Sequence, residues 1–189
     1  MENMENMDFE AMRDKQADEL MQLLDERRMK ELQLRLEDMN EFDVAEFLTE
    51  IGDNRMPMVF RLLSKQTAAD VFANFDAPEQ EQIINSITDS ELSAIIEELY
   101  VDDAVDMMEE LPANVVKRVM RTATPETRRL INQYLNYPEN SAGSIMTAEF
   151  VDLKKYMNVR ESIARIRRIG EDKETIYTCF VTSADRKLE

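Results

Sequence analysis

The chain has 189 residues, of which 43% are hydrophobic and 33% are charged, a composition typical of a soluble globular protein with one or two domains. It contains no histidine and a single cysteine, Cys179, which excludes an internal disulfide, a cysteine-based metal site and histidine-dependent catalysis. The net charge of -17 argues against nucleic acid or an anionic membrane surface as a partner.

The negative charge is distributed unevenly along the chain. Residues 1–147 contain 32 acidic and 14 basic residues, whereas residues 148–189 contain 8 acidic and 9 basic residues. No lysine or arginine lies between Lys65 and Lys117, an interval that contains thirteen acidic residues. Because a solvated helix surface normally mixes both signs of charge, the missing counter-charge in this interval requires a reason.

The first twelve residues, 1–12, are rich in Met, Glu and Asn without any period, and they predict a disordered tail. This stretch lacks the basic start and the apolar core of a signal peptide, and no run of the chain is long enough to cross a bilayer. The sequence therefore predicts a cytosolic chain. Two helices are predicted next, at about residues 14–26 and 29–39, because leucine and methionine recur there at helical spacing.

From residue 47 onward, apolar residues recur at a step of twelve. One register is apolar at all eight positions: Phe47, Val59, Val71, Ile83, Ile95, Met107, Val119 and Ile131. The register four residues later is also apolar throughout: Ile51, Leu63, Phe75, Ile87, Leu99, Leu111, Ala123 and Leu135. A third register is apolar except at its last position: Leu48, Phe60, Phe72, Ile84, Ile96, Met108, Met120 and Asn132. Turn or capping residues follow the triplets, with Tyr100 as the exception: Gly52, Ser64, Asp76, Thr88, Pro112, Thr124 and Asn136.

Each unit of twelve residues therefore predicts a helix of about two turns that is closed by a short loop. Isolated helices shorter than roughly 12 to 15 residues are marginal in water, so these helices persist only when their apolar stripes stack on neighbours. The sequence predicts a mainly α fold over residues 13–137, a right- or left-handed superhelical stack of 24-residue hairpins. A three- or four-helix bundle is the structural alternative, but it does not explain the strict step.

The stretch YPENSAGSIMT ends the helical pattern and predicts a joint over residues 138–147. Pro138, Asn140, Ser141 and Gly143 are residues that break periodic structure and favour turns. The joint therefore separates two domains that are built differently.

Residues 148–189 predict a partial α/β unit: a short strand near residues 150–153, a helix over 156–169 that ends at Gly170, and a second strand over 175–181. A sheet of two strands cannot normally bury its face. We therefore expect an incomplete domain, with its last forty or so residues poorly ordered, repacked or completed by another copy.

These three parts together resemble the MgtE family of magnesium channels. The joint carries the most specific likeness, because eight of its residues match that family's signature YPEDSAGxxMT: Tyr137, Pro138, Glu139, Ser141, Ala142, Gly143, Met146 and Thr147. In that family, a superhelical N-terminal domain is followed by a pair of CBS domains, a connecting helix and a transmembrane pore. The resemblance implies that residues 148–189 are an incomplete CBS domain. It also implies a non-enzymatic regulatory region on the cytoplasmic face of the membrane, soluble as this fragment and homodimeric in the full-length protein.

Three aspartates are the candidate ligands for a cation. Asp102 and Asp106 are four residues apart, so they project from one face at the start of a helix. Asp70 stands in the same register as Asp106, three steps earlier, so the stack could present both along one side. Mg²⁺ prefers oxygen ligands and is commonly held by one or two carboxylates together with waters. It would also remove the repulsion between two such acids, roughly 4 kcal/mol for unit charges ~4 Å apart at an effective dielectric near 20.

The resemblance extends this set of ligands. It implies that Mg²⁺ bridges the superhelical domain to the CBS pair and the connecting helix, and that its binding holds the pore closed when intracellular magnesium is plentiful. It implies metal contacts for Asp70, Asp102 and Asp106, with a backbone carbonyl near Gly143 or Ser144 as a further ligand. The family often has Glu at the position where this chain has Asp70, and the side chain of aspartate is shorter than that of glutamate.

Plainer interpretations stay open. The acids could form a solvated face, and Asp102 could be only the N-cap of a helix at Asp103–Leu111. The alternative function is a helical-repeat adaptor for protein binding, similar to the flagellar rotor switch protein. An enzyme is not predicted, because the sequence offers no general base, nucleophile or phosphate-binding loop.

Overall fold

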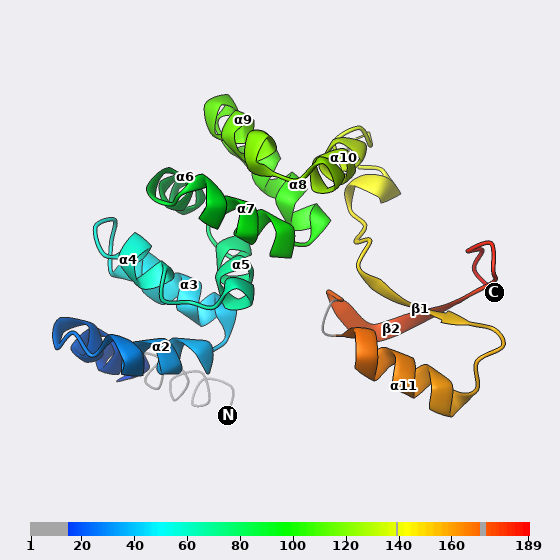
Figure 1. Cartoon of the computed structure of the whole chain (residues 1–189), viewed down its shortest axis with the longest axis horizontal. Helices are drawn as coiled ribbons and strands as arrows, with labels where there is room; N and C mark the ends of the chain where they lie inside the picture. Colours follow the sequence, from blue (N-terminus) through cyan, green and yellow to red (C-terminus); the bar gives the residue numbers. More distant parts are fainter. Residues whose placement is uncertain (1–14, 139, 171–172) are drawn as a thin grey trace, which may run out of the picture. The chain divides into compact units, whose positions relative to one another are not determined.

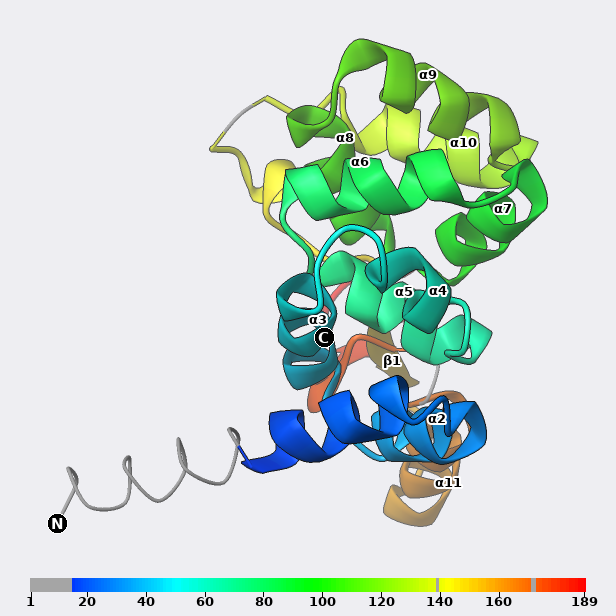
Figure 2. The ribbon, with the colours of Figure 1, turned by 90° about the vertical axis from the view of Figure 1, so that its left-hand side faces the viewer.

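The computed structural model describes residues 15–138, 140–170 and 173–189, and it is mainly helical (Figures 1 and 2). The predicted disordered tail at residues 1–12 lies outside the described residues. Residues 15–25 are helical, and the next helices are α2 (Met29–Glu37), α3 (Glu41–Glu50), α4 (Met56–Phe60), α5 (Lys65–Ala73), α6 (Ala77–Ser86), α7 (Asp89–Glu98), α8 (Val101–Glu110), α9 (Ala113–Thr122) and α10 (Pro125–Tyr134). The joint and the C-terminal segment contain a 3-10 turn (Ala142–Ser144), β1 (Phe150–Lys154), α11 (Val159–Ile169) and β2 (Thr175–Thr182).

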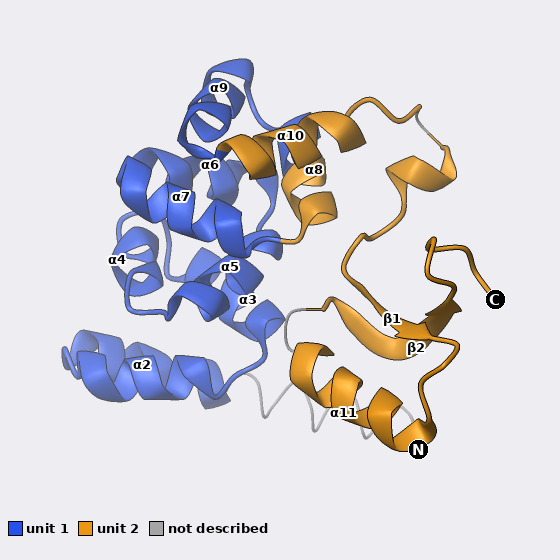
Figure 3. Cartoon of the chain, turned by 45° about the vertical axis from the view of Figure 1, so that its right-hand side comes forward, with its two compact units in different colours: residues 1–99, 107–124 blue, residues 100–106, 125–189 orange. Residues whose placement is uncertain are grey.

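The chain divides into two compact units (Figure 3). Unit 1 consists of residues 1–99 and 107–124, and unit 2 consists of residues 100–106 and 125–189. Helix α8 therefore contributes its N-terminal half to unit 2 and its C-terminal end to unit 1. The joint, α10 and the β-α-β segment all belong to unit 2.

Unit 1 is a stack in which helices pack on the helix two places further along the chain. Helix α3 packs on α5, α5 on α7 and α7 on α9, while α4 packs on α6 (Figure 2). This arrangement confirms the predicted fold class, many short helices followed by a small sheet with one helix. Each helix is too short to be stable alone, so packing between alternate helices supplies the stability that local structure lacks.

Many of the apolar residues that recur at a step of twelve are buried in the core. All eight residues of the first register are buried, with exposed fractions of 5% or less. The third register is buried from Leu48 to Met108, whereas Asn132 is exposed. The second register is less regular, and its last member, Leu135, is 39% exposed because α10 has already ended at Tyr134.

Most of the predicted capping positions begin helices. Ser64, Asp76, Thr88 and Pro112 are the N-caps of α5, α6, α7 and α9. Gly52 is an exception, because its φ of +79° places it in a left-handed turn between α3 and α4. This turn uses residues that the step assigns to a helix, so α4 has only five residues.

Two glutamates tie helices together across the stack. Glu37, at the end of α2, accepts hydrogen bonds from the backbone N–H of Ser64 at 2.5 Å and from Thr67 Oγ1 at 2.6 Å. Glu97, in the last turn of α7, accepts hydrogen bonds from the N–H and the hydroxyl of Thr124 at 3.1 and 3.2 Å. Both carboxylates therefore accept hydrogen bonds from backbone N–H groups outside their own helix.

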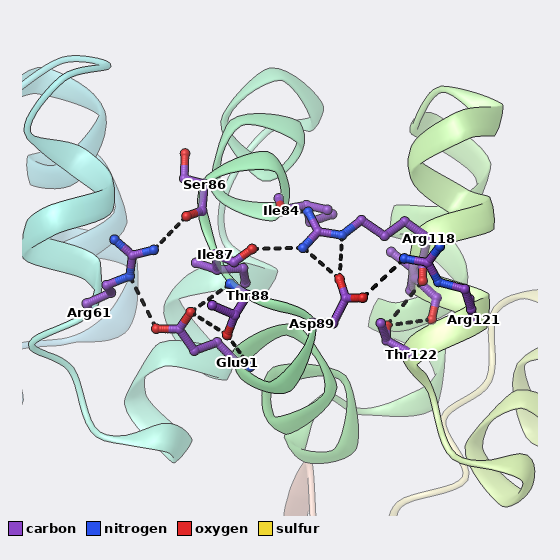
Figure 4. Close-up of polar contacts among 11 residues, drawn as sticks. Arg61, Ile84, Ser86, Ile87, Thr88, Asp89, Glu91, Arg118, Arg121 and Thr122 are labelled. Carbon is purple, nitrogen blue, oxygen red and sulfur yellow. Dashed lines mark hydrogen bonds and ion pairs between the residues drawn. The ribbon is translucent and has the colours of Figure 1, made fainter.

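The best-defined local cap in unit 1 is at the start of α7. Thr88 Oγ1 accepts from the N–H of Glu91 at 3.2 Å, and the Glu91 carboxylate accepts from the N–H of Thr88 at 2.7 Å (Figure 4). The Thr88→Ala variant is expected to lose about 1 kcal/mol of the free energy of unfolding, because it leaves an N–H at the helix start without its partner. Urea denaturation measures this loss, and an unchanged midpoint would contradict it.

The C-terminal segment forms the predicted β-α-β pattern. Strands β1 and β2 pair in parallel, with Phe150 opposite Thr175 and Lys154 opposite Thr182. Helix α11 begins at Val159 rather than at residue 156, because Asn158 caps it and accepts from the N–H of Glu161 at 3.0 Å. Among the described residues after the joint, only Val151 and Thr182 are buried, so the segment has little core of its own.

Within the described ranges, none of the helices has the length and apolar character needed to cross a membrane.

Candidate metal site

Asp102 is a half-buried carboxylate in the first turn of α8. Its neighbours Val101 and Ala104 are buried, with exposed fractions of 8% and 1%. The Oδ1 atom of Asp102 is itself buried, and it has no hydrogen-bond partner among the described residues. A buried carboxylate oxygen without a partner is costly, so it is a feature that calls for a bound cation or water. The interpretation of Asp102 as the N-cap of a helix at 103–111 is wrong, because α8 already begins at Val101.

The electrostatic environment of Asp102 is unfavourable to its negative charge. Burial, and after it the carboxylates of Glu174, Asp103 and Glu149, together raise the pKa of Asp102 from 3.8 to about 6. The position of Asp102 at a helix N-terminus would favour a negative charge, so desolvation and neighbouring acids outweigh the helix dipole. All four acids belong to unit 2.

Glu149 and Glu174 were not among the predicted site residues. They precede Phe150 and Thr175, which are partners in the parallel register of β1 and β2. The N–H of Glu174 donates to the carbonyl oxygen of Glu149 at 3.1 Å, so the two residues lie side by side at the same edge of the sheet. The signal that could have found them is the β-α-β pattern, because the residues before two parallel strands meet at one edge.

Asp106 lies one turn after Asp102 on the same face of α8, as predicted, and its side chain is exposed. Within the part of the chain that the structure describes, no group of three or more Asp, Glu, Cys or His side chains has a geometry that could hold a metal ion.

Asp70 belongs to unit 1, in helix α5. Its two carboxylate oxygens accept from the Gln66 side-chain amide at 3.1 and 3.3 Å. Burial raises the pKa of Asp70, and the carboxylates of Glu41 and Glu98 raise it further, while the Gln66 hydrogen bond lowers it. Asp70 thus shares with Asp102 an environment that disfavours its negative charge, although its oxygens already have a partner.

Gly143 and Ser144 lie in the 3-10 turn of the joint. The hydroxyl and the N–H of Ser144 both donate to the carbonyl oxygen of Ser141, at 3.0 and 3.2 Å. The Ser141 Oγ atom is buried and has no hydrogen-bond partner among the described residues. Gly143 lies directly against the ring of Tyr137, where a Cβ atom would approach ring carbons to 2.5 Å. The turn is therefore held by its own hydrogen bonds and by an aromatic ring.

A family model described as the MgtE intracellular N domain matches residues 39–140. The magnesium transporter MgtE of Thermus thermophilus is 30% identical over 182 residues, which are 94% of this chain and 40% of that protein. The magnesium transporter MgtE of Bacillus subtilis is 17% identical over 166 residues, which are 88% of this chain and 37% of that protein. The chain thus spans about two fifths of the length of these curated relatives.

Two solved structures share the fold. The crystal structure of the soluble part of a magnesium transporter has a TM-score of 0.84 at 22% identity, over 93% of this chain and 70% of that one. The crystal structure of the cytosolic domain of the Mg²⁺ channel MgtE in complex with ATP has a TM-score of 0.76 at 29% identity, over 92% of this chain and 71% of that one.

Proposed function

Because the chain belongs to the family of the MgtE intracellular N domain, we propose that it senses Mg²⁺ through its acidic residues and thereby regulates the pore of a magnesium transporter. The relatives are a magnesium transporter and a Mg²⁺ channel, and the domain that this chain resembles in them is not an enzyme. In this proposal the chain lies on the cytoplasmic face of the membrane. Its partners are the CBS pair, the connecting helix and the pore of the same transporter, which is a homodimer.

The observation that carries the proposal is the environment of Asp102. One of its oxygens is buried without a partner, and three neighbouring carboxylates make its negative charge still less favourable. A divalent cation supplies positive charge where these four acids repel one another, and Mg²⁺ prefers oxygen ligands of this type. The residues present therefore fit a hard cation.

The residues that would hold the ion come from two parts of unit 2. Asp102 and Asp106 provide carboxylates from one face of α8, and the joint offers a backbone carbonyl at Gly143 or Ser144. Asp70, which belongs to unit 1, is proposed as an acidic metal contact in its own right. Mg²⁺ usually keeps several waters and uses only one or two carboxylates, so the lack of a cluster of three acids in the described ranges is compatible with an ion shared with other parts of the transporter.

Regulation follows from charge. Without a cation, the acidic face repels other acidic surfaces, because the interval between Lys65 and Lys117 contains thirteen acidic residues and no lysine or arginine. With Mg²⁺ bound, this repulsion is removed and the stack can dock on its partner domains, which biases the pore towards the closed state. Regulation would thus depend on the difference in Mg²⁺ affinity between the docked and the undocked state.

Thermal unfolding of the 189-residue chain against Mg²⁺ concentration tests the proposal. Millimolar Mg²⁺ is expected to raise the melting temperature more than K⁺ of matched ionic strength or Ca²⁺ does, by about 2 to 4 °C for each kcal/mol of binding free energy. The double variant Asp102→Asn, Asp106→Asn is expected to lose this difference. The matched control is Glu126→Gln, which removes one exposed charge in the first turn of α10. This variant is expected to retain the larger response to Mg²⁺. An equal response of the double variant and the unaltered chain would refute the assignment of these ligands.

A further inference from the structure

We propose that Tyr137 is a positioning residue for the Mg²⁺ site, because its ring supports the turn at Gly143 and is itself held in place by the ring of Tyr134. This inference rests on the proposed function. It assigns a role to two aromatic side chains that would themselves touch no metal ion.

The first contact in this chain is between Gly143 and Tyr137. A Cβ atom at Gly143 would lie 2.5 Å from the ring atoms Cδ1 and Cγ of Tyr137 and 2.9 Å from Cδ2. Real Cβ atoms do not approach other heavy atoms to less than 3.0 Å, so only glycine allows this packing. Gly143 does not have a positive φ, and therefore the close approach of the ring, not an unusual backbone conformation, requires a glycine here.

The second contact joins Tyr137 to Tyr134. Their ring centroids are 5.7 Å apart and their planes are inclined by 77°, an edge-to-face arrangement that aromatic pairs prefer. The N–H of Tyr137 donates to the carbonyl oxygen of Tyr134 at 2.9 Å, and Gln133 Nε2 donates to the Tyr137 hydroxyl at 3.3 Å. Tyr137 is thus held by hydrogen bonds at its backbone N–H and at its hydroxyl group.

The third observation is the burial of Tyr134, which is only 6% exposed. Its buried ring is a fixed support for the ring of Tyr137. Tyr134, Tyr137 and Gly143 therefore form one set of packed residues within unit 2, the unit that also contains Asp102. Through this set, the orientation of the carbonyl groups in the turn depends on the aromatic pair.

The measured quantity is the Mg²⁺ concentration at which the rise in melting temperature is half of its maximum. Gly143→Ala and Tyr137→Leu are each expected to raise this concentration by about tenfold, since residues that orient metal ligands typically contribute 10- to 100-fold to affinity. In the double variant, the smaller leucine makes room for the new methyl group, so its effect is expected to be less than the product of the two single effects. Gly170→Ala is the matched control, because its new Cβ atom would lie 3.1 Å from Ile176 Cγ2, a milder contact than at Gly143, and it is expected to have no effect on the Mg²⁺ response.

If Gly143→Ala fails to fold, the comparison of Tyr137→Phe with Tyr137→Leu still tests the role of Tyr137. Tyr137→Phe retains the ring and loses only the hydrogen bond from Gln133, so its half-maximal Mg²⁺ concentration is expected to stay within about twofold of the unaltered chain, in contrast to Tyr137→Leu. A Mg²⁺ response that is the same in Tyr137→Leu and in the unaltered chain overturns the role of Tyr137 alone. If the unaltered chain shows no specific Mg²⁺ response, the proposed function fails, and this inference fails with it.

Discussion

Without divalent cations at pH 7.5, the Asp102→Asn variant is expected to be more stable than the unaltered chain by about 1 to 2 kcal/mol. The reason is that asparagine carries no charge, whereas Asp102 is ionised at this pH in a site where burial and three neighbouring carboxylates disfavour the charge. The difference between a pKa of 3.8 and about 6 corresponds to at most about 3 kcal/mol, and partial exposure of the side chain reduces it. Urea denaturation of both proteins measures the difference.

The sign of the pH dependence follows from the raised pKa of Asp102. The carboxyl group holds its proton more tightly in the folded state, so its contribution to stability is fully present below pH 3.8 and is lost as the pH rises through about 6. The unaltered chain is therefore expected to lose stability relative to Asp102→Asn between pH 4 and pH 7. A constant difference across this range would show that Asp102 is not the group that titrates.

Magnesium is expected to reverse the order of stability. Bound Mg²⁺ stabilises the ionised form of Asp102, and so it raises the stability of the unaltered chain but not that of Asp102→Asn. Glu126→Gln serves again as the control, since it removes one exposed acid from the same unit and is expected to change neither the pH dependence nor the Mg²⁺ response. If Mg²⁺ stabilises Asp102→Asn as much as it stabilises the unaltered chain, Asp102 is excluded as a ligand.

The second large effect is expected at Arg118 in α9. Its guanidinium donates to the carbonyl oxygens of Ile84 and Ile87 at the end of α6, the latter at 2.8 Å (Figure 4). It also donates to Asp89 Oδ1 at 2.9 Å, and it is 23% exposed. One side chain therefore satisfies carbonyl groups that the helix end leaves free and bridges to the start of α7.

The Arg118→Ala variant is expected to lose about 2 to 3 kcal/mol of the free energy of unfolding, because it leaves two shielded carbonyls and the Oδ1 atom of Asp89 without their charged donor. Arg121→Ala is the matched control. Arg121 pairs with the other oxygen of Asp89 at 3.1 Å, but it is 70% exposed, so water and salt screen its contribution. Chemical denaturation that gives equal losses for the two variants would contradict the role of Arg118 in tying α6, α7 and α9.

Much of the stack could be predicted from local pattern. The register from Phe47 to Ile131 recurs at twelve residues and is buried throughout, because a helix of two turns with one apolar stripe has only one stable way to cover that stripe. Gly52 shows the limit of this reasoning. Its left-handed φ shortens α4, and a repeat of apolar residues carries no information about the dihedral angles of a single turn.

The candidate site could be predicted only in part. Asp102 and Asp106 were found because a spacing of four residues places two side chains on one helix face. Glu149 and Glu174 were missed because they act on Asp102 only after the parallel pairing of β1 and β2 has placed them together. The assignment of the ligands themselves, including Asp70 and the carbonyl at Gly143 or Ser144, stays a prediction.

By itself, the sequence determined which residues are buried in the stack, where most helices begin, and that an acidic interval without lysine or arginine precedes the joint. These properties depend on spacing and side-chain chemistry within one or two helical turns. Only the tertiary structure decided that Asp102 has a buried oxygen without a partner and that Gly143 lies on the ring of Tyr137. Desolvation, the repulsion between distant acids and close packing depend on which segments meet in space, and no local pattern contains that information.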